Sequence, residues 1–238
     1  MGNAVIAACN DLARRLCAHA APLLGVAVER VEYRDGGVGV VGSDRFLAAK
    51  AIIEKTFGAR GCTVQGEGRF TPPNTVPPDK ETGQTPKMSA FWMYATHVAD
   101  VEVDLDTGRV KVLKVVAVHD AGTIINPEGA IGQIEGGVVQ GLGATLCEEM
   151  LVDDGIVTNA SFAEYKIPTS VDVPEIVPMW VESPHAEGPY GAKGLSEPAL
   201  APTAPAVANA IYNATGARVT SLPITPEKVL AALRAAGR

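Results

Sequence analysis

The chain has 238 residues and a mass of 24.7 kDa, and 47% of its residues are hydrophobic, which suffices for one large domain or two small ones. Its net charge is −7 and no basic cluster is interleaved with aromatic residues, so nucleic acid is not expected as a partner. No apolar run reaches the roughly 18 residues of a membrane span and no secretory leader is visible, so we expect a cytoplasmic protein.

The first part of the chain predicts a small helical and β segment followed by a loop. Apolar residues at intervals of three and four predict a helix from Asn3 to Leu16. Residues 28–41 alternate in the β pattern around Asp35-Gly36-Gly37, which predicts a hairpin. Ser43 then suits the N-cap of a helix that continues through Ile53. Residues 66–87 are rich in proline and glycine and predict a long irregular loop.

The clearest sheet signal follows this loop. Valine-rich runs at 98–105 and 110–118, separated by Asp106-Thr107-Gly108, predict two long antiparallel strands. His119 and Asp120 come next and could suggest a catalytic dyad. Because adjacent residues of a strand point to opposite faces, we favour a structural role for both.

A glycine-rich helix is predicted over residues 127–150, where one apolar stripe recurs at helical spacing. Each interior glycine costs about 1 kcal/mol relative to alanine, so we expect compensation by close approach of another backbone or of a large cofactor. Gln133, Gly137 and Gln140 share one helical face, which suits a planar polar ligand. The glycines of this helix are Gly132, Gly136, Gly137, Gly141 and Gly143.

The last third of the chain predicts two further strands at 163–168 and 176–181 and two closing helices at 204–214 and 226–233. Between them, residues 189–198 crowd two glycines, a lysine and an acid into one short segment. Glycine permits close backbone approach and positive φ, and a proline at 198 restricts the acid before it to extended conformations. The residues alone leave two interpretations open, an ordinary glycine turn before a helix or a ligand-binding loop.

The four cysteines, Cys9, Cys17, Cys62 and Cys147, contain no C-x-x-C pair. Iron-sulfur and zinc sites need closely spaced thiolates, so we expect neither on this chain and no protein-ligated metal. We interpret the cysteines as buried thiols.

Five blocks of sequence, in this order, resemble the molybdenum hydroxylase family of xanthine dehydrogenase and aldehyde oxidoreductase. They lie at residues 2–5, 99–108, 118–141, 165–168 and 191–198. The likeness is to the C-terminal part of the molybdopterin-binding subunit and covers nearly the whole chain. It implies an α+β fold, with mixed, mainly antiparallel sheets packed with helices. Its parts would be a helix and hairpin segment to residue 65, a loop to 88, and a cofactor-binding remainder.

The resemblance also assigns site residues. The glutamate that matches Glu197 acts as general base beside the molybdenum, and the glutamine that matches Gln133 binds the pterin. The residues that match Lys193, Gly194, Leu195 and Ser196 lie along the cofactor. The family usually has glycine where this chain has Ser196.

The implied cofactor is molybdenum-molybdopterin cytosine dinucleotide, shared with a partner chain that carries the N-terminal part of the subunit. A 2Fe-2S subunit and an FAD subunit are implied as electron acceptors. The implied reaction hydroxylates an electron-poor carbon of an N-heterocycle, aldehyde or aromatic with oxygen from water. Two alternatives stay open: a noncatalytic structural or assembly module of such a complex, and a different cofactor enzyme with a glycine-rich helix.

Overall fold

The computed structural model describes residues 1–58, 63–73 and 75–237. The chain divides into two compact units, Met1–Ala90 and Phe91–Arg238. Among the described residues, no helix is both long enough and apolar enough to cross a membrane.

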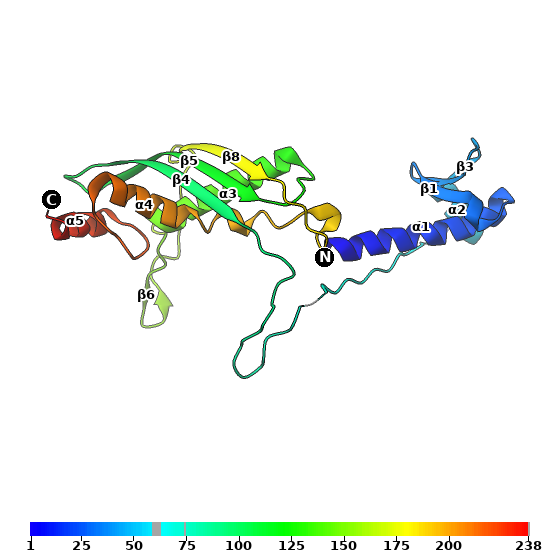
Figure 1. Cartoon of the computed structure of the whole chain (residues 1–238), viewed down its shortest axis with the longest axis horizontal. Helices are drawn as coiled ribbons and strands as arrows, with labels where there is room; N and C mark the ends of the chain where they lie inside the picture. The colour runs from blue at the N-terminus through cyan, green and yellow to red at the C-terminus, as the bar shows by residue number, and fades with distance from the viewer. Residues whose placement is uncertain (59–62, 74, 238) are drawn as a thin grey trace. The chain divides into compact units, whose positions relative to one another are not determined.

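The first unit is a long helix packed on a small antiparallel sheet (Figure 1). It contains α1 (Gly2–Leu24), β1 (Val31–Arg34), β2 (Gly37–Val40), β3 (Phe46–Ala48) and α2 (Ala49–Phe57). The predicted hairpin is confirmed, because β1 and β2 pair antiparallel. The core is formed by apolar side chains of these elements: Leu16, Ala20, Ala21, Leu24, Val31, Val38, Val40 and Ile52.

The predicted helix start at Ser43 is wrong. Residues Phe46–Ala48 pair with β2 as strand β3, so α2 begins only at Ala49. The Ser43 hydroxyl instead accepts a hydrogen bond from the Arg45 backbone N–H at 3.3 Å, a local turn contact that competes with capping. Strand pairing with the hairpin therefore overrides the local capping signal.

The described residues of the predicted loop at 66–87 contain no helix or strand. Its first residues nevertheless lie against α1, because side chains at Gly66 and Gly68 would collide with the carbonyl oxygens of Ala8 and Ala4. The Asp11 carboxylate accepts a hydrogen bond from the Glu67 backbone N–H at 2.9 Å. This bond is the main cause of the lowered pKa of Asp11, with Arg15 and Arg14 as further causes.

The second unit is built on a three-stranded sheet in the order β4-β5-β8. The predicted long strand pair is confirmed as β4 (Ala95–Val103) and β5 (Val110–Asp120), which run antiparallel. Strand β8 (Glu175–Val181) pairs parallel with β5, so the sheets are mixed but mainly antiparallel. The predicted α+β fold is confirmed.

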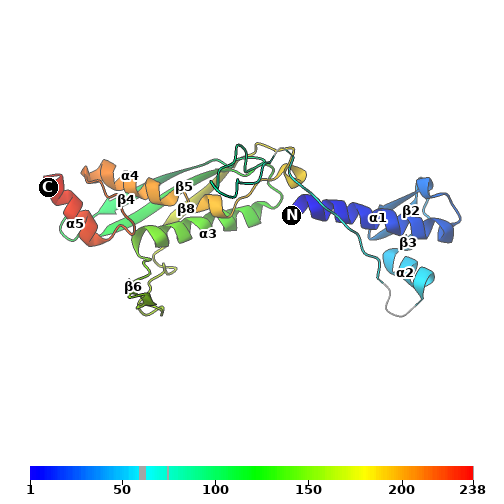
Figure 2. The ribbon, with the colours of Figure 1, turned by 90° about the horizontal axis from the view of Figure 1, so that it is seen from below.

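Helices α3 (Pro127–Leu146), α4 (Thr203–Thr215) and α5 (Pro226–Ala235) pack with this sheet (Figures 1 and 2). The predicted end of α4 and start of α5 are confirmed by their caps: Gly216 is left-handed with φ 75°, and the Thr225 hydroxyl accepts from the Lys228 N–H. Helix α3 ends at Leu146, short of the predicted residue 150. The core lies between helices and sheet and includes Val115, Ala117, Ile134, Val138, Leu142, Val207, Ile211, Val229 and Leu233.

Two further expectations are wrong. Residues 163–168 are not a strand: the Glu164 and Tyr165 N–H groups both donate to the Ser161 carbonyl, which makes a turn, and the Tyr165 hydroxyl donates to Glu148. The cysteines are not buried either, because Cys9 and Cys147 are exposed and Cys17 is half-buried. Cys62 lies outside the described residues. Two short strands, β6 (Val152–Asp153) and β7 (Ile156–Val157), form a hairpin beyond α3 (Figure 1).

Candidate functional site

The segment 189–198 forms two single turns, η2 (Pro189–Gly191) and η3 (Glu197–Ala199), joined by an extended stretch. The extended stretch lies against the segment that follows β5. The Lys193 N–H donates to the Ala121 carbonyl at 2.9 Å, and the Thr123 N–H donates to the Gly191 carbonyl at 3.0 Å. A side chain at Gly122, whose φ is 63°, would collide with the Gly191 carbonyl. Glycine at 122 therefore allows the two backbones to meet.

A buried ion pair strengthens the same contact. The Lys193 ammonium lies 2.6 Å from the Asp120 carboxylate, with side-chain exposures of only 6% and 12%. The other oxygen of Asp120 accepts from the Gly122 N–H at 3.2 Å. Asp120 thus holds both sides of the contact, a role that the sequence did not reveal because its partner lies 73 residues away.

Tyr190, at the start of this segment, has φ 55° and its side chain is 74% exposed. A positive φ is uncommon for a residue other than glycine and is costly for a bulky side chain. The strained conformation precedes the hydrogen bonds of Gly191 with Thr123 and His185, which fix the backbone there.

The turn η3 and the residues that follow it pack against α3 at two glycines. A Cβ at Gly137 would lie 2.5 Å from the Ala199 Cβ and 3.2 Å from the Ser196 carbonyl oxygen. A Cβ at Gly141 would lie 2.7 Å from Thr203. Close approach of another backbone, one of the two compensations expected for the glycine-rich helix, therefore accounts for these two positions.

Gly132 and Gly136 differ from these two glycines, because nothing lies within 4 Å of a Cβ built at either position. Gln133 and Gln140 are exposed on the same helix, and Gln133 lies one turn before Gly137. This part of α3 presents bare backbone and an amide side chain to the surface. The predicted bare face at Gly137, between Gln133 and Gln140, is wrong, because Ala199 covers Gly137.

The structure separates the expected site residues into two groups. The Lys193 side chain turns inward to Asp120, and Leu195 packs against the hydrophobic core. Gly194, Ser196 and Glu197 are exposed. Within the described residues, no hydrogen bond or ion pair engages the Glu197 carboxylate.

Two buried histidines lie on strands β4 and β5, and the sequence analysis considered only one of them, His119. His97 on β4 and His119 on β5 approach with their Nε2 atoms 2.9 Å apart, and the Thr203 hydroxyl lies 3.2 Å from His97 Nδ1. Burial, followed by the charge of His119, lowers the pKa of His97 from 6.5 to about 4. Burial also lowers the pKa of His119. His119 and Asp120 do point to opposite sides of the strand, as expected, and neither acts with the other as a dyad.

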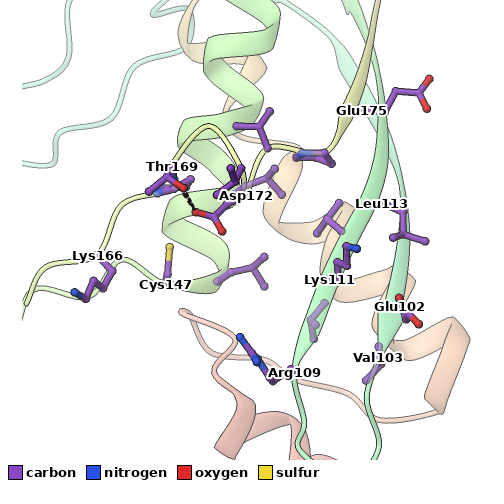
Figure 3. Close-up of a pocket in the computed structure, with 18 of the residues that line it drawn as sticks. Glu102, Val103, Arg109, Lys111, Leu113, Cys147, Lys166, Thr169, Asp172 and Glu175 are labelled. Carbon is purple, nitrogen blue, oxygen red and sulfur yellow. Dashed lines mark hydrogen bonds between the residues drawn. The ribbon is translucent and has the colours of Figure 1, made fainter.

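A groove with a volume of about 1200 Å³ lies elsewhere in this unit, between β4, β5, the end of α3 and residues 166–175 (Figure 3). None of the expected site residues lines it. Partial desolvation, followed by the charges of Glu148 and Asp172, raises the pKa of the Cys147 thiol, so less of it is present as the reactive thiolate. Hydrogen bonds from Thr169 lower the pKa of Asp172 and stabilise a loop turn (Figure 3).

Residues 1–174 match the family of the molybdopterin cofactor-binding domain. The chain belongs to this family. It is 39% identical over 140 residues, 58% of the chain, to the putative xanthine dehydrogenase molybdenum-binding subunit XdhA of Escherichia coli, covering 19% of that protein. It is 32% identical over 238 residues, 98% of the chain, to the probable hypoxanthine oxidase XdhD of the same species, covering 23% of it.

Solved structures agree with the sequence relatives. The aldehyde oxidoreductase from Desulfovibrio desulfuricans superposes on 97% of the chain with a TM-score of 0.64 and 30% identity, over 22% of its own length. The expected relationship to the molybdenum-binding subunit of molybdenum hydroxylases is thus confirmed. The chain spans less than a quarter of the length of each of these three proteins.

The residues of the second unit fit a molybdopterin cofactor. A Cβ could be added at Gly132 or Gly136 without contact, so the backbone there is open to a flat group, and the Gln133 amide lies between the two glycines in sequence. The exposed backbone at Gly194 and the carboxylate of Glu197 add polar groups that no hydrogen bond within the described residues uses.

Proposed function

We propose that this chain is the C-terminal part of the cofactor-binding domain of a molybdenum hydroxylase, and that Glu197 is its general base. The observation that carries the proposal is the contrast around Glu197: the backbone on both sides is fixed, yet the carboxylate itself is exposed and has no partner within the described residues. A general base needs this arrangement, because it must be positioned and still free to accept a proton.

The chain's own residues would hold the cofactor as the sequence resemblance assigns them. The Gln133 amide can donate to and accept from a pterin edge, since it carries both kinds of group. The backbone from Lys193 to Ser196 would lie along the cofactor, while the Lys193 ammonium keeps that backbone in place through Asp120. When bound, the cofactor supplies the transfer of water-derived oxygen and accepts two electrons from substrate. The Glu197 carboxylate would take up the proton that this hydroxylation releases.

The remaining assignments rest on the same resemblance and on the relatives' names. The substrate class is an electron-poor carbon of an N-heterocycle, aldehyde or aromatic, and the cofactor is the cytosine dinucleotide form. The partners are a chain with the N-terminal part of the molybdenum subunit, a 2Fe-2S subunit and an FAD subunit, in the cytoplasm. Two relatives are themselves named as molybdenum-binding subunits, which supports a multi-chain enzyme.

The test is Glu197→Gln in the assembled enzyme. We expect molybdenum and pterin content to stay unchanged while turnover falls about 10²- to 10⁴-fold, the usual loss for a positioned general base. Glu164→Gln, which neutralises an exposed carboxylate outside the segment, is the matched control and should keep full turnover. Near-normal turnover of Glu197→Gln would sink the assignment of the base.

Metal analysis of the same samples tests the cofactor itself. Molybdenum and cytosine-dinucleotide pterin that copurify with the complex would support the proposal. A fully assembled complex without molybdenum would instead indicate a noncatalytic assembly module.

A further inference from the structure

The strongest feature that the proposed function leaves unexplained is the buried histidine pair. His97 and His119 are diagonal neighbours on adjacent strands, because His97 pairs with Ala117 and His119 with Ala95. His119 is 1% exposed and Thr203, which touches His97, is 0% exposed. Buried polar groups normally serve a structural or functional purpose, because an unsatisfied group costs free energy. The three side chains therefore need a joint explanation.

The contacts decide which nitrogen of each ring carries the proton. Two neutral imidazoles whose Nε2 atoms lie 2.9 Å apart share one proton, so one Nε2 donates and the other accepts. Within the described residues, His119 Nδ1 is buried without a partner. With its proton on Nε2, His119 has an acceptor, and the assignment allows three hydrogen bonds among His119, His97, Thr203 and Ala199 where the opposite one allows two.

The remaining bonds then follow in one direction. His119 Nε2–H donates to His97 Nε2, so the proton of His97 must lie on Nδ1 and point to the Thr203 hydroxyl at 3.2 Å. The Thr203 hydroxyl then donates its own proton to the Ala199 carbonyl at 3.4 Å. The opposite assignment leaves His119 Nδ1–H as a buried donor without an acceptor and removes the bond to Ala199.

Ala199 is the last residue of η3, the turn that Glu197 begins. The turn has few bonds of its own: the Ala199 N–H donates to Ser196 at 3.2 Å, and the Leu200 N–H donates to Glu197 at 3.1 Å. A further bond at the Ala199 carbonyl therefore fixes the end of the turn opposite to the anchored Lys193.

We propose that His119, His97 and Thr203 form a directed hydrogen-bond chain that holds the turn η3, so that these three are positioning residues for Glu197. The hydrogen bonds that hold the turn are independent of the proposed function. Only the role of Glu197 as general base rests on it. Protonation of His97 turns its acceptor Nε2 into a donor and breaks the chain, whereas protonation of His119 adds a proton at Nδ1, which has no partner within the described residues.

The charged groups around the pair are few. Asp120 follows His119 on β5 but is paired with Lys193, and η3, which packs against β5, contributes the exposed Glu197. From the opposing elements, α4 contributes the Thr203 hydroxyl and β8 places Trp180 beside His119 in the register. The pair is therefore neutral at neutral pH, and acid is the condition that charges it.

The first test reads the tautomers directly in the full chain, labelled with ¹⁵N at histidine. The chain has four histidines, so each signal can be assigned by replacing one histidine at a time with glutamine. At pH 7.5 we expect His119 to carry its proton on Nε2 and His97 on Nδ1. The reverse tautomers, or two charged rings, would overturn the proposal.

The second test measures amide exchange at Ala199 and Leu200 in the assembled enzyme. Thr203→Val removes the hydroxyl at similar volume and should speed exchange there about three- to tenfold, whereas Thr203→Ser keeps the hydroxyl and should restore protection. Thr215→Val is the control, because Thr215 is also buried in α4 and donates to a carbonyl four residues back, but contacts no histidine. Equal exchange in all three variants would overturn the proposal.

Neither test needs turnover or bound metal. If Glu197→Gln keeps its turnover but the histidine tautomers are as expected, the proposed base is wrong and the hydrogen-bond chain stands. If Glu197→Gln is inactive but the tautomers are reversed, the base stands and the hydrogen-bond chain is wrong.

Discussion

The two ends of the segment 191–198 differ in how the fold holds them. At its start, Gly191 and Lys193 are bound to the segment after β5 by backbone hydrogen bonds and a buried ion pair. At its end, Ser196 and Glu197 are exposed, and they are held through their backbone, by hydrogen bonds from the Ala199 and Leu200 N–H groups and by the packing of the turn on Gly137. The difference shows how a fold can fix the position of a carboxylate without engaging it.

The largest expected effect comes from breaking the anchored start. Lys193→Met leaves the Asp120 carboxylate without its cation in a nearly buried site, so we expect a loss of about 3 kcal/mol in the free energy of unfolding. Lys114→Met is the matched control, because Lys114 forms a 2.8 Å pair with Glu175 on the same sheet at side-chain exposures of 42% and 63%. That loss should stay below about 1 kcal/mol. Equal losses in urea titrations would contradict the anchoring role.

The next effect concerns the contact between α3 and η3. Gly137→Val places a branched side chain against Ala199 and the Ser196 carbonyl, so overpacking should cost about 2 kcal/mol or more. Gly136→Ala, one residue earlier, enters open space and should gain up to about 1 kcal/mol from helix propensity. Thermal unfolding of both variants compares the packed and open glycines, and a stable Gly137→Val chain would refute the packing.

A smaller effect is expected from acid. The pKa of His97 is lowered from 6.5 to about 4, so the unfolded chain binds a proton at a pH where the folded chain does not. Stability should therefore be complete above pH 6.5 and fall as the pH approaches 4, by about 2 kcal/mol at pH 5. Unfolding measured from pH 7.5 to 5 checks this. His97→Asn, which keeps a donor near the Nδ1 position, should flatten the dependence.

The smallest effect is expected at the open end. Glu197→Gln alters an exposed carboxylate without a partner in the described part of the chain, so the free energy of unfolding should change by less than about 0.5 kcal/mol. The measurement is the same urea titration that is used for Lys193→Met. A loss above about 1 kcal/mol would mean that the carboxylate stabilises the fold and is not held free.

Elements with a strong local pattern could be predicted from the sequence. The alternating valines gave the pair β4 and β5, and Thr225-Pro226 marked the start of α5, because pleat period and capping depend on neighbours in the chain. The predicted helix start at Ser43 and the predicted strand at 163–168 were wrong, because tertiary contacts override the local sequence preferences there. Strand β3 pairs with the hairpin, and the Tyr165 hydroxyl bonds to Glu148. The site residues assigned by resemblance stay predictions.

By itself, the sequence determined the long strand pair and the glycine-rich helix through their periodicity, which is a property of the chain alone. The resemblance of five ordered blocks implied the family and, with it, the α+β class. Only the tertiary structure decided which glycines are packed and which are open, and that Lys193 turns to Asp120 while Glu197 stays uncommitted. It also decided that His97 forms hydrogen bonds with His119 and with Thr203, which lies 106 residues away in the sequence. Contacts over such separations have no local pattern, because they depend on how strands and helices pack.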